Sequence, residues 1–328
     1  MSKTVIVVGL GSMGRRRIRL LKQAYPKIII GGVDSQQARL DEAEKQFSIP
    51  VFTDINKAVD TIKPVAGFVC TSPLSHYAVI MKLLSHRLHV FTELNLVDDG
   101  YDEMMALAKN QKCELFLSST MLYRKDIQYI IERVKDKKVN YTVHIGQYLP
   151  DWHPWESYKD FFVGNVRTNG CREHMAIDFP WVLSAFGEVE SFSVMRDKSS
   201  SLEIDYEDNY FIMCQHKNGN KGIFITELIS RKGGRNVKVF SEDMHITWAG
   251  TPDSLYDYDI ENKVDRRIET YNEALVRQKD YNACIIENAY LDEIKTFFGV
   301  IGQQFKALYT FEDDKKTIAL INEIEGRS

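Results

Sequence analysis

The stretch VIVVGLGSMG, residues 5–14, decides the fold of the first part of the chain. A run of apolar β-branched residues leads into the pattern G-x-G-x-x-G, and a helical pattern follows directly. In such a loop the first glycine permits a tight turn, the second lets the backbone approach a pyrophosphate, and the third lets helix and strand pack closely. The predicted dinucleotide contacts of this loop are Gly9, Gly11, Ser12, Met13 and Gly14.

An acidic residue extends this motif. Asp34 follows the next apolar run, residues 28–33, and lies twenty residues past Gly14. A carboxylate there can accept hydrogen bonds from both ribose hydroxyls and would repel a 2′-phosphate, so the pattern predicts NAD rather than NADP. The alternative is a glycine-rich turn followed by an aspartate in solvent.

Three consecutive arginines, residues 15–17, follow the glycine loop. Cations in a first helical turn oppose the helix macrodipole. A bound pyrophosphate could compensate one of them, and we expect at least two of the three to be exposed on a solvated helix face.

Two rhythms follow one another along the chain. Short β-branched runs alternate with helical patterns up to about residue 120, which predicts an α/β domain with a parallel sheet covered on both faces. After about residue 123 strand patterns succeed one another, with a hairpin signal, Lys-Asn-Gly-Asn, at residues 217–220. Helical patterns resume near 281–298 and 311–324. The second part is therefore predicted to be α+β, with a mostly antiparallel sheet.

Composition excludes several classes of partner. The formal net charge of −4 gives no support to nucleic-acid binding. The five cysteines are odd in number and form no C-x-x-C pair, which argues against a disulfide framework or zinc knuckle and suits a reducing cytoplasm. The sequence has no apolar run near the roughly 18 residues of a membrane span and no signal-peptide pattern. We expect a cytoplasmic protein without a metal site.

Three further segments carry a resemblance to a known family. Thr-x-Pro-x-x-His occupies residues 71–76, HVFTELNL occupies 89–96, and SSTMLYR occupies 118–124. With the glycine loop, the chain resembles the glucose–fructose oxidoreductase / inositol dehydrogenase / MocA family. The resemblance implies a Rossmann domain, residues 1–122, then an α+β domain with an open-faced, mostly antiparallel sheet, residues 123–328. It also implies that cofactor and substrate meet between the domains, and that homodimers or homotetramers form through the sheet.

The same resemblance implies roles for individual residues. The residues that match the stretch lining the nicotinamide half of NAD are Thr71, Ser72, Pro73 and His76. Glu93 matches the glutamate of the family's Glu-Lys-Pro motif, but Leu94 and Asn95 replace the lysine and the proline. The family's second-domain motif, Asp-x-Gly-x-His-x-x-Asp, has its histidine opposite Ile177 here. Glu93 is therefore expected to position groups near the nicotinamide, and any proton transfer must come from elsewhere.

One histidine is the first candidate for that transfer. In the helical pattern of residues 172–186, i,i+4 spacing brings His174 and Asp178 within reach, and the aspartate could fix the tautomer of the imidazole. If Pro180 begins the helix instead of kinking it, this geometry is lost. The predicted catalytic set is His174, Asp178 and Glu93, and a structural His–Asp pair is the alternative.

A loop at residues 148–162 holds six aromatic residues, a histidine and several charged residues. Aromatic faces can stack on sugars while the charged groups bond hydroxyls or a carboxylate. A loop folded onto the core or a partner subunit is an equal alternative. The predicted substrate contacts are Arg124, Trp152, His153, Trp155 and Lys159.

These features favour an NAD-dependent oxidoreductase acting on a sugar, sugar acid or nucleotide-sugar hydroxyl. Members of the family with similar aromatic loops suggest bacterial surface-sugar metabolism. The alternative is a dinucleotide-binding protein of the same family without dehydrogenase activity, serving as a sensor or partner subunit.

Overall fold

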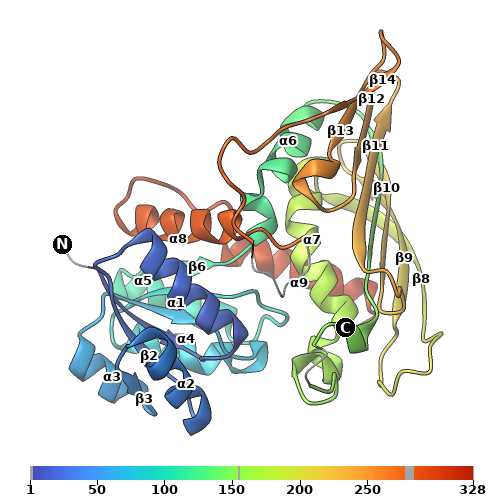
Figure 1. Ribbon diagram of the computed structural model, residues 1–328. Coiled ribbons are helices and arrows are strands. Elements are labelled where there is room, and N and C mark those ends of the chain that lie inside the picture. The colour runs from blue at the N-terminus through green and yellow to red at the C-terminus, as the bar shows by residue number, and fades with distance from the viewer. Residues whose placement is uncertain (1–2, 154–155, 278–283, 328) are drawn as a thin grey trace. The chain divides into compact units, whose positions relative to one another are not determined.

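The computed structural model describes residues 3–153, 156–277 and 284–327, and its chain divides into two compact units (Figure 1). The first unit contains Met1–Ser119 and Tyr290–Ile318, and the second contains Thr120–Ala289 and Ala319–Ser328. A single division at residue 122 was predicted, so the assignment of 290–318 to the second domain is corrected here.

The packing of residues 290–318 within the first unit has a physical reason. Phe297 lies edge-on or tilted against Phe68, Phe91 and Phe116, with ring centroids 5.4, 5.6 and 5.6 Å away. Those three phenylalanines belong to neighbouring strands of the first sheet, and burying a phenylalanine on them removes a large apolar surface from water.

The first unit is built on a six-stranded sheet in the order β3-β2-β1-β4-β5-β6, with every pair parallel. Its strands are β1 (Thr4–Val8), β2 (Ile29–Val33), β3 (Val51–Phe52), β4 (Ala66–Val69), β5 (His89–Thr92) and β6 (Leu115–Leu117). Its helices are α1 (Ser12–Ala24), α2 (Gln37–Phe47), α3 (Ile55–Ile62), α4 (His76–Ser85) and α5 (Tyr101–Gln111). This strand order is that of a Rossmann fold, as predicted. In folds of this order dinucleotides bind where the strand order reverses, which here is between β1 and β4.

The second unit is built on an eight-stranded sheet in the order β14-β13-β12-β11-β7-β10-β9-β8. Its strands are β7 (Asn140–Gly146), β8 (Val189–Asp197), β9 (Asn209–His216), β10 (Lys221–Glu227), β11 (Gly234–Ser241), β12 (Met244–Trp248), β13 (Tyr256–Asp259) and β14 (Val264–Arg267). Only the β7–β10 pair is parallel, so the predicted mostly antiparallel sheet is confirmed. The predicted hairpin at 217–220 joins β9 to β10, and Gly219 has the positive φ of +86° that its turn requires.

Helices cover one face of this second sheet (Figure 1). They include α6 (Lys125–Val134) and α7 (Gly170–Phe186). Phe179 of α7 packs on Phe224 of β10 and Phe186 stacks on Tyr141 of β7, with ring centroids 4.6 and 4.0 Å apart. The last two helices, α8 (Glu287–Ile301) and α9 (Phe311–Ile324), each run across the division between the units. None of the helices in the described residues has the length and apolarity needed to cross a membrane.

Candidate cofactor and catalytic site

The glycine loop has the local geometry that its pattern predicted. Gly9 has a φ of +92°, and a Cβ there would lie 2.6 Å from the carbonyl oxygen of Cys70. A Cβ at Gly14 would lie 1.9 Å from the Gly9 carbonyl oxygen, so any larger residue would separate α1 from the loop. A Cβ at Gly11, in contrast, would meet nothing closer than Arg39 at 4.0 Å. The second glycine therefore leaves the backbone open to a ligand at the N-terminus of α1.

Asp34 fixes the other side of this turn. It is buried at the end of β2, where its Oδ2 accepts the Leu10 amide at 2.7 Å and its Oδ1 accepts the Gln36 amide at 2.9 Å. These two bonds orient the carboxylate beside the glycine loop, as the motif requires.

The three arginines of α1 differ from expectation. Arg15 is partly exposed and pairs with Glu42, but Arg16 is 5% exposed and Arg17 is fully buried. The prediction that at least two would be exposed is therefore wrong. The guanidinium of Arg16 lies 4.9 Å from the Tyr290 ring, and that of Arg17 bonds two carboxylates.

Arg17 joins three elements of the first unit. Its Nε lies 2.5 Å from Glu93 Oε1 and its Nη2 lies 2.8 Å from Glu293 Oε2, while the ring of Phe91 lies 4.5 Å from its guanidinium. Burial alone would lower the pKa of Arg17, but the two glutamates raise it well above its ordinary value. Arg17 therefore stays charged and ties α1 to the end of β5 and to α8.

Glu93 was predicted as both a catalytic and a cofactor-contacting residue, and its geometry supports only a fixed anion. Its two oxygens accept from Arg17 Nε at 2.5 Å and Nη2 at 3.1 Å, which is a bidentate ion pair. Both oxygens of Glu93 are already occupied by the Arg17 guanidinium, so the geometry does not support the catalytic part of the prediction. Its positioning role stays a prediction.

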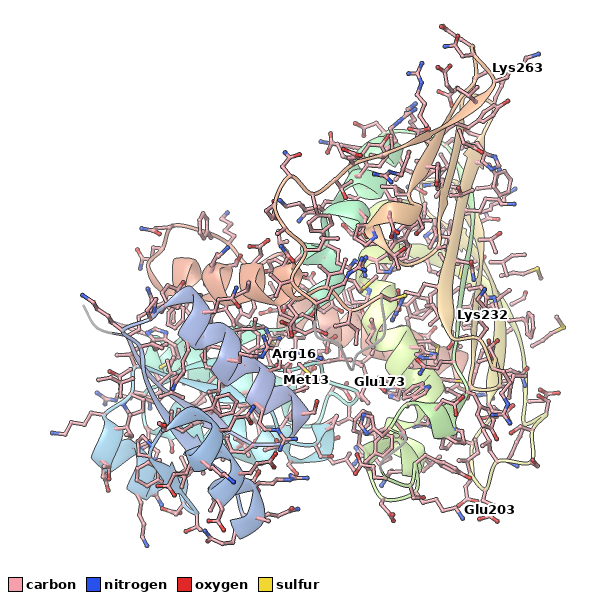
Figure 2. The ribbon with its side chains drawn as sticks, in the orientation of Figure 1. Met13, Arg16, Glu173, Glu203, Lys232 and Lys263 are labelled. Atoms are coloured by element: carbon pink, nitrogen blue, oxygen red, sulfur yellow. The ribbon has the colours of Figure 1, made fainter. Side chains whose placement is uncertain are left out.

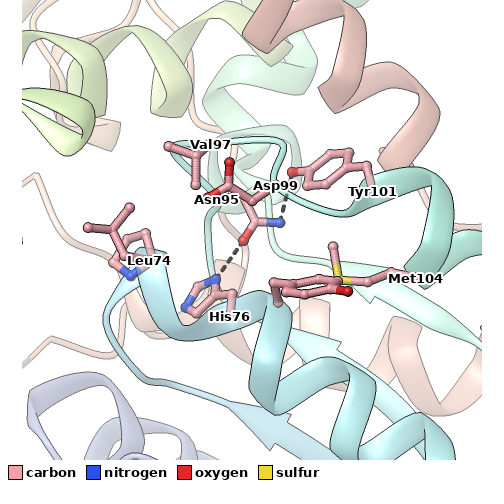
Figure 3. Close-up of a pocket in the computed structure, with 9 residues that line it drawn as sticks. Leu74, His76, Asn95, Val97, Asp99, Tyr101 and Met104 are labelled. Carbon is pink, nitrogen blue, oxygen red and sulfur yellow. Dashed lines mark hydrogen bonds between the residues drawn. The ribbon is translucent and has the colours of Figure 1, made fainter.

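The loop that follows β4 is held by an unexpected residue. His76 is buried, its Nε2 lies 2.9 Å from the Thr71 carbonyl oxygen, and its Nδ1 lies 2.5 Å from Asn95 Oδ1. Asn95 Nδ2 donates to the Tyr101 hydroxyl at 2.8 Å (Figure 3), and that hydroxyl in turn donates to Asp314. Burial lowers the pKa of His76, although both of its hydrogen bonds oppose this. Asn95, which stands where the family has proline, thus fixes the histidine and the Thr71 backbone.

Four residues of this loop were predicted to line the nicotinamide. Pro73 and His76 lie in the wall of a small pocket together with Asn95 and Tyr101 (Figure 3). The Thr71 hydroxyl is buried and has no hydrogen-bond partner among the described residues. An orphaned hydroxyl of this kind costs about 1–3 kcal/mol unless a ligand satisfies it. Contacts of Thr71, Ser72, Pro73 and His76 with the cofactor stay predictions.

The predicted pair of His174 and Asp178 does not form among the described residues. The helix α7 begins at Gly170 and contains Pro180, so Asp178 lies inside it rather than in a cap. Its carboxylate accepts Trp181 Nε1 at 2.7 Å and pairs with Arg235 at 3.1 Å. His174 Nδ1 instead lies 3.0 Å from Thr226 Oγ1. The Arg235 guanidinium and the Trp181 indole both bond the Asp178 carboxylate, so Asp178 does not orient the His174 imidazole.

Burial also makes His174 a weak base. It lowers the pKa of His174 to about 3, with Arg235 contributing, so the imidazole is neutral at physiological pH. The Trp152 ring lies against it, with centroids 4.8 Å apart. General base catalysis works best when the pKa of the base lies near the working pH, and His174 does not meet this condition.

The neighbouring residue meets that condition and was missed. Burial raises the pKa of the Glu173 carboxyl to about 7, and Arg235 opposes part of this rise. Glu173 is labelled in Figure 2, and its Oε2 is buried without a hydrogen-bond partner in the described part of the chain. The sequence carried a signal for it, because Glu173 lies four residues before Ile177, where the family motif has its aspartate.

The predicted substrate contacts in the loop of residues 148–162 have different hydrogen-bond and ion-pair partners. Trp152 donates its indole N–H to the Gln147 carbonyl at 3.2 Å, His153 Nδ1 lies 2.7 Å from Glu156, and Lys159 pairs with Glu203. Trp155 lies outside the described residues. These geometries leave the substrate roles of Trp152, His153 and Lys159 as predictions.

Arg124 is the exception, because its guanidinium is occupied. It is 3% exposed, its Nε donates to Asp126 at 2.9 Å, and it also donates to the carbonyls of Gly250 and Cys284 at 3.0 and 2.6 Å. The prediction that Arg124 contacts substrate is therefore corrected to a structural role within the second unit.

The fold and the glycine loop define a dinucleotide-binding protein of the Rossmann class. Residues 3–119 match the family model described as the GFO_IDH_MocA oxidoreductase family, NAD-binding Rossmann fold. Residues 3–119 thus form a domain of the glucose–fructose oxidoreductase / inositol dehydrogenase / MocA family, as the resemblance implied, and the cofactor of this domain is NAD.

Solved structures resemble the chain over nearly its whole length. UDP-N-acetylglucosamine 3-dehydrogenase GnnA from Acidithiobacillus ferrooxidans has a TM-score of 0.78 and 15% identity, covering 98% of this chain and 96% of its own. An oxidoreductase from Agrobacterium radiobacter, in complex with NAD⁺, L-tartaric acid and magnesium, gives 0.80 and 14%, covering 98% and 95%. The WlbA dehydrogenase from Bordetella pertussis, in complex with NADH and UDP-GlcNAcA, gives 0.74 and 12%, covering 99% and 95%. At these identities the likeness establishes the fold alone. No curated protein sequence matches the chain.

Within the described residues, no group of three or more His, Cys, Asp or Glu side chains could hold a metal ion.

Proposed function

We propose that this protein is an NAD-dependent oxidoreductase that acts on a hydroxyl of a sugar, a sugar acid or a nucleotide sugar. The NAD-binding domain supplies one half of the support. The other half is the named substrates of structural neighbours, which include dehydrogenases of nucleotide sugars. NAD, when bound, would supply hydride transfer to or from the substrate carbon. The chain must therefore supply a group that takes the hydroxyl proton as the substrate carbon is oxidised.

The observation that carries this proposal is the Glu173 carboxyl. Its pKa of about 7 lets it exist in both protonation states near neutral pH. Its buried Oε2, unpartnered among the described residues, is an acceptor still to be satisfied. In the oxidative direction the ionised carboxylate accepts the hydroxyl proton, and in the reductive direction the acid returns it. Arg235 opposes part of the rise in the pKa of Glu173, which favours the ionised form of the carboxyl.

The test is Glu173→Gln, compared with Glu190→Gln, a matched loss of an exposed carboxylate on β8 of the same unit. We expect the first variant to lower kcat by roughly 10²–10⁴ with NAD affinity unchanged, and the second to change neither. Because a protonated acid cannot accept a proton, the oxidative rate of the native protein should rise with pH through about 7. A Glu173→Gln protein with native kcat would exclude this role.

A second candidate is a dinucleotide-binding protein without dehydrogenase activity. Leu94 and Ile177 replace the two groups that carry protons in the family motifs, and this favours it. A panel of sugars, sugar acids and nucleotide sugars separates the two candidates. Change in bound NADH absorbance on addition of a substrate supports the enzyme, and tight NAD binding without turnover across the panel supports the alternative.

We also propose that the protein is a homodimer or homotetramer formed through the uncovered face of the second sheet. The exposed apolar residues of three adjacent strands there are Met195 of β8, Phe211 and Met213 of β9, and Ile223 of β10. Met195 is opposite Phe211 and Met213 is opposite Ile223, so these residues form one patch. A patch of this kind marks an interaction surface. Light scattering should give a multiple of the chain mass that Met213→Glu reduces, whereas a monomeric native protein would exclude the proposal.

The proposed location is the cytoplasm. All five cysteines are free thiols, which agrees with a reducing compartment. The metabolism of bacterial surface sugars is the proposed pathway class, because neighbours that act on nucleotide sugars share the fold.

A further inference from the structure

Four buried side chains of the first unit form one continuous chain of hydrogen bonds. The chain starts at the Thr71 carbonyl oxygen, 2.9 Å from His76 Nε2, and continues from His76 Nδ1 to Asn95 Oδ1 at 2.5 Å. Asn95 Nδ2 donates to the Tyr101 hydroxyl at 2.8 Å (Figure 3), and that hydroxyl donates to Asp314 on α9. None of the four side chains is more than 3% exposed, so water does not replace a missing bond.

The number of hydrogen atoms in this chain is limited. Each of the four contacts needs one hydrogen between its two heavy atoms. A neutral His76 supplies one, the NH₂ end of Asn95 supplies one to the neighbour that it faces, and the Tyr101 hydroxyl supplies one. An ionised Asp314 supplies none. A neutral imidazole and an ionised carboxylate therefore leave one contact as two acceptors facing each other, which is unfavourable in a buried site.

One additional proton completes the chain in either of two arrangements. With the bonds directed as above, His76 donates from both ring nitrogens and is an imidazolium, while Asp314 is ionised. With the Asn95 amide turned over, the amide donates to a neutral His76 and accepts from Tyr101, and a protonated Asp314 donates to Tyr101. Both arrangements contain the same number of protons, so the proton belongs to the chain rather than to one residue.

Burial and charge act in opposite directions at the His76 end of the chain. Burial lowers the pKa of His76, whereas its bonds to Asn95 and the Thr71 carbonyl and the nearby charge of Glu93 raise it. The Thr92 hydroxyl lies 3.4 Å from His76 Nδ1 and donates to the Glu93 carbonyl oxygen at 3.2 Å. The other titratable side chains that line the pocket beside His76 are Tyr77, Asp99 and Tyr101.

Two phenols face the carboxylate at the Asp314 end. Tyr309 lies 3.0 Å from Oδ1, and Tyr101 faces Oδ2. Burial raises the pKa of both phenols, and the charge of Asp314 adds to the rise. Neither phenol ionises near neutral pH, so the proton that the chain exchanges with solvent is carried by His76 or Asp314. The charged neighbours of Asp314 on α9 are exposed or partly exposed; they are Glu312, Asp313, Lys315 and Lys316.

We propose that this chain is a proton-binding site that couples the loop of residues 71–76 to pH. It holds one proton beyond those of a neutral His76 and an ionised Asp314, and all four bonds form only while that proton is bound. An unfolded imidazole releases its proton near pH 6.5. The folded chain keeps its proton to higher pH, because release breaks a buried bond. Above the release pH the hold on the Thr71 carbonyl weakens, and NAD affinity falls with it.

Nuclear magnetic resonance of the native protein tests the proton directly. The ¹⁵N shifts of the His76 ring and the ¹³C shift of the Asp314 carboxyl report their protonation states, and His76→Gln and Asp314→Asn assign the signals. At about pH 7 we expect either an imidazolium at His76 or a protonated acid at Asp314. A neutral His76 together with an ionised Asp314 at that pH would overturn the proposal.

The variant Asp314→Asn tests the count of hydrogens. An amide at position 314 can donate to Tyr101 and still accept from Tyr309, so it completes the chain without the additional proton. The folded native protein then binds one proton more than the folded variant, while their unfolded states bind equally above about pH 5. Native stability relative to the variant is therefore greatest at low pH and is lost as pH rises. In urea denaturation, the unfolding constant of the variant relative to the native one should fall about tenfold per pH unit between about pH 5 and 8.

Glu312→Gln is the matched control, because it removes an exposed carboxylate two residues earlier on the same helix. Its unfolding constant relative to the native one should stay within about twofold over the same pH range. A ratio for Asp314→Asn that is equally flat would contradict the additional proton.

The effect on the loop is measured by NAD binding. NADH fluorescence should show native affinity falling by up to tenfold per pH unit above the release pH, and no such fall in Asp314→Asn. Parallel pH profiles of the two proteins would overturn the coupling. These measurements follow protonation, unfolding and dinucleotide binding, so their failure would leave the proposed role of Glu173 untouched.

Discussion

Replacing Arg17 by methionine removes the one positive charge that Glu93 and Glu293 share in the first unit. The side chains of Arg17 and Glu293 are fully buried and that of Glu93 is 12% exposed, so water cannot replace the lost partner. Breaking a buried ion pair by removing one member costs about 3–5 kcal/mol. We expect a loss of that size in the free energy of unfolding at pH 8, measured by urea denaturation. Arg15→Met, which breaks the more exposed pair with Glu42, should cost about 0–1 kcal/mol.

The stability of the Arg17→Met variant should also depend on pH in a different way from that of the native protein. Burial raises the folded-state pKa of Glu293 and Arg17 opposes that rise, so removing the arginine raises this pKa further above the unfolded value of about 4.3. The Glu293 carboxyl then destabilises the fold increasingly as pH rises from its unfolded pKa to its folded pKa, and little at lower pH. The variant should therefore come closer to native stability at pH 5 than at pH 8. Adding Glu93→Gln and Glu293→Gln should flatten this dependence. A loss below about 1 kcal/mol, with the same pH profile as the native protein, would refute the assignment of Arg17 as the buried counter-ion.

Three further predictions concern the cofactor and substrate sites. NAD(H) should bind at least tenfold more tightly than NADP(H), about 1.4 kcal/mol, and Asp34→Ala should narrow that gap; equal native affinities in a fluorescence titration would contradict the prediction. Asn95→Leu leaves His76 Nδ1 and the Tyr101 hydroxyl without their shared partner and should lower stability by about 1–3 kcal/mol in thermal unfolding, with NAD affinity weakened; native values of both would show that Asn95 does not hold the loop. Trp152→Ala should raise KM for the substrate and leave NADH affinity nearly unchanged, whereas unfolding or dissociation of an oligomer would assign Trp152 a structural role.

The sequence predicted the parts of the molecule that depend on local pattern. The strand, the glycine loop and α1 are contiguous, so their geometry follows from the residues themselves, and Gly9 has the positive φ that its turn needs. The hairpin at 217–220 is local in the same sense. Each needs only backbone preferences and the next few residues, which a single sequence contains.

The predictions that were wrong depended on distant partners. Arg17 was expected at the surface, but its carboxylates lie 76 and 276 residues away in the sequence. His174 and Asp178 have the spacing of a pair, yet Arg235, 57 residues further on, takes the aspartate. Spacing shows which groups can meet, and only the fold shows which competitor is stronger. Glu173 could have been found, because its place before Ile177 was visible in the sequence.

The end of β5 shows why the proposed proton transfer is assigned to another element. Glu93 is held in a bidentate pair by Arg17, Leu94 has no polar group, and the Asn95 amide is divided between His76 and Tyr101. Each polar side chain of this segment is thus satisfied by a residue of the first unit. A group already satisfied in the protein must break a bond before it can accept a substrate proton, which adds to the barrier. Glu173 has the opposite character, since one carboxyl oxygen is unpaired in the described structure and its pKa is about 7. We therefore expect the segment with Leu94 in place of the lysine to position the cofactor, and we assign the proposed acid–base work to α7, which carries Glu173.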